Sequence, residues 1–166
     1  LVVSVKILLD HIYFLENYSP WGFGIWRDRY NKVDLTRFNR YEALSQNREL
    51  FDFIQKTEPG FLKILRSDSN GNLTAMDVRF EYHIHMNRLL SVFPSVSRST
   101  NHGFDQQGMH CSGMNAVFDV PLSCESGSIN YDIPIVVDPE VQRRFFKAAK
   151  PPLWLRAYKN IAYYGW

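Results

Sequence analysis

Residues 74–88 read TAMDVRFEYHIHMNR, and apolar side chains recur in this run at helical spacing. Met76, Phe80 and Ile84 fall four residues apart, and a second apolar stripe occupies the neighbouring positions 78, 82 and 86. This pattern predicts a largely buried helix with Thr74 as its N-cap. A polar face of the same helix gathers four side chains: Asp77, Glu81, His85 and Arg88.

The residues that follow this helix, 89–111, predict short strands and a polar loop. The run 89–100 is partly β-branched and is broken by Pro94, which favours two brief strands or one kinked strand. A loop with Gly103 and Gly108 comes next. A polar helix face followed by a strand and such a loop is typical of a substrate site, and it is also typical of ordinary α/β junctions.

Composition limits the class of protein. The chain has 166 residues, which predicts a single domain spanning residues 1–166. A hydrophobic content of 45% excludes a disordered chain. The net charge is only +2 and the Lys and Arg residues are scattered among the acidic ones, which argues against a nucleic-acid partner. Cys111 and Cys124 are too few for a disulfide framework or a zinc site. We therefore expect a reducing, cytoplasmic location, although a single bridge between the two cysteines stays open.

The remaining segments predict further short elements. Residues 1–9 are apolar but too short for a membrane span, so a buried strand or helix is expected. Residues 12–15 end in a turn, residues 39–67 predict two or three short amphipathic helices, and residues 67–72 read as a turn. Residues 112–132 predict a surface loop, 133–137 an extended segment, and 141–149 and 153–163 two helices. The last helix is basic and aromatic, so packing on the domain and peripheral contact with the inner face of a membrane are both considered.

Two tryptophans flank two glycines in residues 21–26, WGFGIW. Glycines let the backbone approach a ligand closely while the rings supply flat surface, as in many sugar sites. The alternative is a helix start that core aromatic residues anchor. We expect one of Trp21 and Trp26 to line a concavity shared with Asp77 and the other to be buried.

Three separated patches resemble a known family. They are PWGFGIWRDRY at 20–30, MDVRF at 76–80, and NHGFD at 101–105 with GMHC at 108–111. In this order they resemble the C-terminal half of bacterial glycosyltransferases that build lipopolysaccharide and capsule sugars and have the A-type nucleotide-sugar fold. A more distant similarity is to the N-acetylglucosaminyltransferases that extend N-glycans.

The resemblance implies an α/β fold, the acceptor-side half of an A-type glycosyltransferase, with several short helices around a few short strands. The chain contains no counterpart of the family's nucleotide-binding half and its acidic motif, so the isolated chain is expected to be inactive. In a complete enzyme, a nucleotide-sugar donor, a glycan or lipid-linked acceptor and a manganese or magnesium ion would take part in surface polysaccharide biosynthesis.

The resemblance also implies roles for particular residues. Asp77 would be the general base that takes the acceptor proton, with Glu81 one helical turn on as the fallback, and His110 would ligate the metal. Substrate contacts would come from Trp21, Gly22, Trp26, Arg79, Asn101, Gly103, Phe104 and Asp105. In the alternative interpretations, Asp77 only stabilises the helix start or pairs with Arg79, and His110 is an ordinary hydrogen-bonding loop residue.

Two functions from other classes compete with the transferase. A non-catalytic carbohydrate-binding domain would use Trp21, Trp26 and Phe104 as its stacking surface. A purely structural fragment would use the same rings for core packing.

Overall fold

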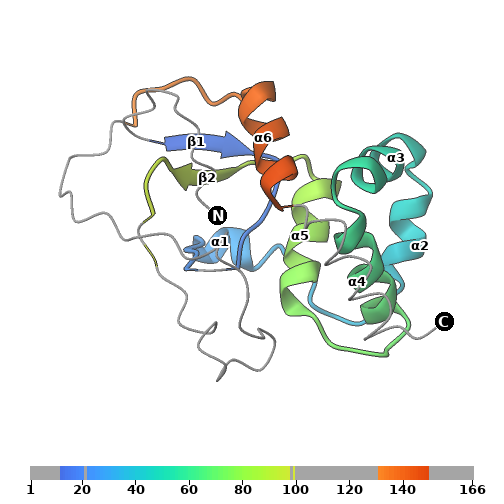
Figure 1. Cartoon of the computed structure of the whole chain (residues 1–166). Helices are drawn as coiled ribbons and strands as arrows, with labels where there is room; N and C mark the ends of the chain where they lie inside the picture. The colour runs from blue at the N-terminus through green and yellow to red at the C-terminus, as the bar shows by residue number, and fades with distance from the viewer. Residues whose placement is uncertain (1–11, 21, 98, 100–130, 150–166) are drawn as a thin grey trace, which may run out of the picture.

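The computed structural model describes residues 12–20, 22–97, 99 and 131–149. Within them the chain is mixed α/β, with six helices and one two-stranded sheet (Figure 1). The strands are β1 (Ile12–Leu15) and β2 (Ser91–Pro94). The helices are α1 (Arg27–Tyr30), α2 (Arg40–Ser45), α3 (Arg48–Thr57), α4 (Pro59–Ser69), α5 (Met76–Met86) and α6 (Pro139–Ala149). The predicted combination of short helices and few strands is confirmed at this level, and the glycosyltransferase fold itself stays a prediction.

The small sheet pairs the start of the described chain with the residues after α5. β1 and β2 are antiparallel, with Ile12 opposite Pro94 and Leu15 opposite Ser91. One strand is therefore present in residues 91–94, where two brief strands or a kinked one were predicted. An apolar cluster joins the sheet to α6, which lies beside it in Figure 1, and its buried members are Leu15, Val141, Phe145 and Phe146.

Helices α2 to α5 form a second apolar core, built from Leu44, Ile54, Phe61, Leu62, Leu65 and Val78. The side chains of Asn39 and Asn47 cap α2 and α3 by accepting hydrogen bonds from the backbone N–H groups of Glu42 and Leu50, respectively. Pro59 occupies the first turn of α4, where its missing N–H costs nothing. Two or three helices were predicted between residues 39 and 67, and the structure has three, α2 to α4, although α4 continues to Ser69 and shortens the predicted turn.

The structure corrects two predictions about α5. Its N-cap is Ala75 rather than Thr74, and the Ala75 N–H donates to the Asp68 carboxylate at 3.0 Å instead of to a capping hydroxyl. Met76, expected to be buried, is exposed. Glu81 and His85, predicted to lie on a polar face, point inward, because polar side chains from other segments, Asn17 and Glu58, lie beside them.

The apolar segment 1–9 and the C-terminal helix predicted at 153–163 lie outside the described residues. Nearly all of the loop predicted at 112–132 does as well. No helix in the described part of the chain has the length and hydropathy needed to cross a bilayer.

Candidate functional site

An aromatic cluster brings the first two sequence patches together. The Phe80 ring lies 5.7 Å from the ring of Tyr18, 5.9 Å from that of Phe23 and 5.7 Å from that of Tyr30, centroid to centroid. Phe80 itself is buried, whereas Phe23 and Tyr30 are each more than two fifths exposed. Patch 20–30 therefore packs on patch 76–80 and presents aromatic surface to solvent.

Asp77 lies next to this cluster, exposed in the first turn of α5. Burial, followed by the charges of Asp77 and Glu81, raises the pKa of Tyr18 to about 12. The Tyr18 phenol therefore stays protonated at neutral pH and is available as a hydrogen-bond donor. An exposed carboxylate, a phenol and exposed ring faces together can accept, donate and stack against a polyhydroxylated ligand.

Gly22 links the first patch to the residues that precede the third. Its φ of +69° suits glycine, and a Cβ placed on it would lie 2.9 Å from the Ser99 Cβ. The backbone of the first patch thus approaches residue 99 as closely as glycine permits. Residues 101–111 themselves lie outside the described residues.

The other predicted substrate contacts are placed as follows. Trp26 is the N-cap residue of α1 and is 72% exposed, so it is not a buried anchor. Trp21, Asn101, Gly103, Phe104, Asp105 and the predicted metal ligand His110 lie outside the described residues. A concavity shared by Asp77 and a tryptophan was expected, but neither Asp77 nor Trp26 lines the cavities of about 520 and 190 Å³.

Arg79 is held by protein groups. Only 5% exposed, it donates through Nε and Nη2 to Asp68 at 3.1 and 2.9 Å, and through Nη1 to the Leu35 carbonyl oxygen at 2.6 Å. Asp68 therefore takes the partner role that was considered for Asp77. These contacts give Arg79 a structural role, while its predicted substrate contact stays a prediction.

Glu81, the fallback base, belongs to a different and more enclosed group. Asn17, which follows β1, donates through Nδ2 to Glu58 at 2.5 Å and to Glu81 at 3.1 Å. Glu58 lies between α3 and α4, and His85 lies one turn beyond Glu81 on α5. His85 Nε2 is 3.5 Å from Glu58 Oε1.

Burial controls the protonation of this group. It raises the pKa of Glu58 to about 7, against hydrogen bonds from Glu81 and Asn17 that lower it. Burial and then the Glu58 charge raise the pKa of Glu81 well above its usual range. The pair therefore shares a proton that Glu81 donates to Glu58. Burial lowers the pKa of His85 to about 4, so its imidazole is neutral at neutral pH.

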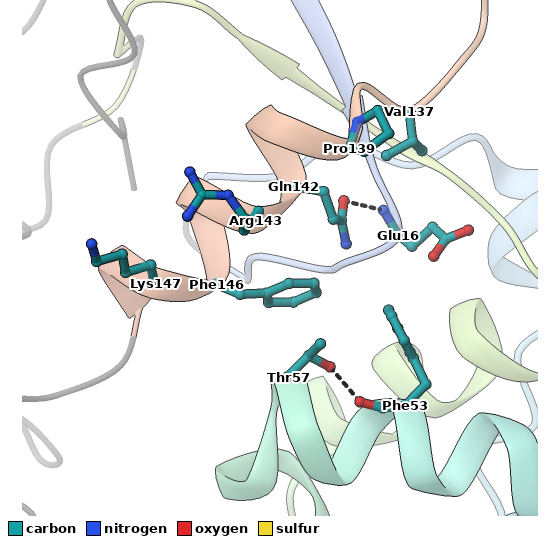
Figure 2. A pocket seen from close by; sticks show the side chains of 9 residues that line it. All are labelled: Glu16, Phe53, Thr57, Val137, Pro139, Gln142, Arg143, Phe146 and Lys147. Atoms are coloured by element: carbon teal, nitrogen blue, oxygen red, sulfur yellow. Dashed lines mark hydrogen bonds between the residues drawn. The ribbon is translucent and has the colours of Figure 1, made fainter.

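Two neighbouring cavities share Glu16 and Phe53 in their walls. The larger, of about 520 Å³, lies between α3 and α6, and its remaining walls are formed by Thr57, Val137, Pro139, Gln142, Arg143, Phe146 and Lys147 (Figure 2). Gln142 accepts the Glu16 N–H through Oε1, and its buried Nε2 has no hydrogen-bond partner. The smaller cavity, of about 190 Å³, is lined in part by His85.

Sequence reasoning identified Glu81 as a site residue but missed Asn17 and Glu58. The four-residue spacing of Glu81 and His85 places both on one helix face and was a usable signal. The sequence around Glu58 and around Asn17 contains no pattern that would predict their role, because each residue joins the group from a distant segment.

Comparison of the chain with protein-family models, with curated proteins and with solved structures finds no match.

Proposed function

We propose that this chain is the acceptor-binding side of a sugar transferase that moves a sugar from a nucleotide donor to a glycan or lipid-linked acceptor, with Asp77 as the general base. One observation carries the proposal. Patches 20–30 and 76–80, separated by more than forty residues, pack together through Phe80 and leave Asp77 exposed beside aromatic surface.

The chemistry of this face suits a sugar. Exposed faces of Phe23 and Tyr30 offer apolar surface to the C–H groups of a pyranose ring, and such rings carry little entropy cost on binding. Asp77 can accept a hydrogen bond from an acceptor hydroxyl. In transfer, it would take that proton while the oxygen attacks the anomeric carbon and the nucleoside diphosphate leaves.

We assign no step to the manganese or magnesium ion that the resemblance implies, because its expected ligand, His110, lies outside the described residues. The donor likewise has no assigned contact in this chain. The proposal therefore concerns acceptor recognition and proton removal.

Binding of oligosaccharides to the chain tests acceptor recognition. On a glycan array, we expect binding to a subset of bacterial surface glycans, with Phe23→Ala lowering the affinity for them at least about tenfold, equivalent to ~1.4 kcal/mol. Phe53→Ala is the matched control, because Phe53 is similarly exposed but lies on α3, away from the cluster. Equal losses in both variants would contradict the proposed face.

Asp77→Asn separates the transferase from the carbohydrate-binding alternative. Glycan binding by this variant should be nearly unchanged, while turnover measured with the donor-binding side present should fall by roughly 10²- to 10⁴-fold. Full activity in the Asp77→Asn variant would contradict the assignment of Asp77 as the general base.

A further inference from the structure

We propose that Glu58, Glu81 and His85 bind one first-row transition-metal ion, with zinc as the best-suited physiological ion. One ligand atom from each residue lies within 4.8 Å of the others. Glu81 and His85 stand one turn apart on α5, and Glu58 comes from the junction of α3 and α4. This site uses neither the Asp77 face nor the aromatic cluster, so it is independent of the proposed function.

The strongest evidence is a buried imidazole nitrogen that has no hydrogen-bond partner. His85 is only 4% exposed, and its Nε2 makes no hydrogen bond among the described residues. The nearest carboxylate atom, Glu58 Oε1, is equally buried and also without a hydrogen bond. A buried polar atom left without a partner in this way destabilises the fold. In the tautomer that leaves a lone pair on Nε2, a cation between this nitrogen and Glu58 Oε1 would satisfy both atoms.

The surrounding residues hold the ligands in place. Asn17 donates to both carboxylates, which fixes their orientation in the way that outer hydrogen bonds orient metal ligands. The Phe61 ring packs against the His85 ring at a centroid distance of 5.3 Å. The 3.5 Å between His85 Nε2 and Glu58 Oε1 matches the span between two ligand atoms bonded to one ion at about 2.0–2.2 Å, whereas a ligand pair near the 4.8 Å limit of the group would have to close. Metal binding should therefore draw the three side chains together.

The donor set selects the kind of ion. Two carboxylates and one imidazole suit zinc, cobalt, manganese and ferrous iron, whereas magnesium and calcium prefer oxygen ligands alone. His85 also lines the smaller cavity, whose charged wall residues are Glu16, Glu49 and Arg88, so a cation can reach the imidazole through this cavity. The bound ion would tie α5 to the α3–α4 junction.

Titration of the metal-free chain with Co²⁺ and Zn²⁺ tests the site. We expect one equivalent of Co²⁺ to produce visible d–d absorption without the near-ultraviolet charge-transfer band of a thiolate ligand, and Zn²⁺ to displace it. His85→Gln should weaken Co²⁺ binding at least about tenfold. His83→Gln is the control, since His83 lies on the same helix outside the ligand group.

Glu81→Gln provides a second ligand variant if His85→Gln fails to fold, because glutamine has nearly the shape of the protonated carboxyl group. It should also weaken Co²⁺ binding at least about tenfold. Absence of stoichiometric binding to the wild-type chain would overturn the proposal. A Co²⁺ spectrum with a thiolate charge-transfer band would also overturn it. So would a loss of Co²⁺ affinity in His83→Gln as large as the loss in whichever of His85→Gln and Glu81→Gln folds.

Discussion

At the scale of single residues, the proton shared by Glu58 and Glu81 makes this buried carboxyl pair sensitive to pH. Glu81 donates to Glu58, and Asn17 donates to both carboxyl groups, so the hydrogen bond between the two carboxyl groups exists only while one proton remains on the pair. Removing it would leave two negative charges facing each other in a largely enclosed position.

Glu81→Gln should make folding stability less dependent on pH when metal is removed with a chelator. The pKa of Glu81 is raised in the folded chain, so the wild type binds more protons folded than unfolded above about pH 4.5. Its stability relative to the variant should therefore fall as the pH rises from 5 to 8. Urea unfolding at both pH values measures this difference.

His85 is present in both proteins, so the stability that its lowered pKa removes below about pH 6.5 largely cancels in the comparison. Glu49→Gln, at an exposed position of α3, controls for the loss of one negative charge. Parallel pH profiles for wild type and Glu81→Gln would show that the pair shares no proton.

At the scale of elements, a buried ion pair fixes the start of α5 against α4. Asp68, fully buried on α4, accepts two hydrogen bonds from Arg79 and one from the Ala75 N–H. A single carboxylate thus both balances the Arg79 charge and satisfies a backbone donor at the helix start.

Asp68→Asn should lower the free energy of unfolding by about 3–5 kcal/mol, because it leaves the Arg79 guanidinium buried without a countercharge. Asp28→Asn, which breaks an exposed pair with Arg29, should cost no more than about 1 kcal/mol. Urea denaturation of the two variants makes the comparison. Similar costs would mean that the Asp68 charge is not needed for packing of α4 and α5.

The sequence predicted elements better than it predicted which helix faces are buried. Helical spacing located α5 and the three helices before it, since apolar periodicity is a local property of the chain. The same periodicity assigned Met76 to the core and left Glu81 and His85 on a polar face. That error arose because the burial of a polar face depends on partners such as Asn17 and Glu58, which are distant in the sequence.

In the candidate sites too, features that depend on local sequence were predicted and contacts between distant segments were not. Motif spacing identified Asp77 and the 20–30 patch, and the structure shows that this patch packs on α5 through Phe80. Asp68 could not be identified as the partner of Arg79, because that pairing depends on how α4 packs against α5.

At the scale of the whole molecule, polar and aromatic residues gather where separate parts of the chain meet. The sheet and α6 form one part, and α2 to α5 form the other (Figure 1). The segment after β1 supplies Asn17 to the buried carboxyl pair and Tyr18 to the aromatic cluster. The proposed metal group and the proposed acceptor face are therefore neighbours on α5, one enclosed and one exposed.

Mapping of a bound oligosaccharide by NMR tests the central claim most directly. With a glycan that binds the array, titration should shift amide resonances of residues 18–30 and 77–80 in a saturable way, while those of α6 stay unchanged. Asp77→Asn should keep these shifts, since it retains a hydrogen-bonding side chain. Saturable shifts confined to the walls of the larger cavity between α3 and α6 would contradict the assignment of the acceptor face to Asp77 and the aromatic cluster.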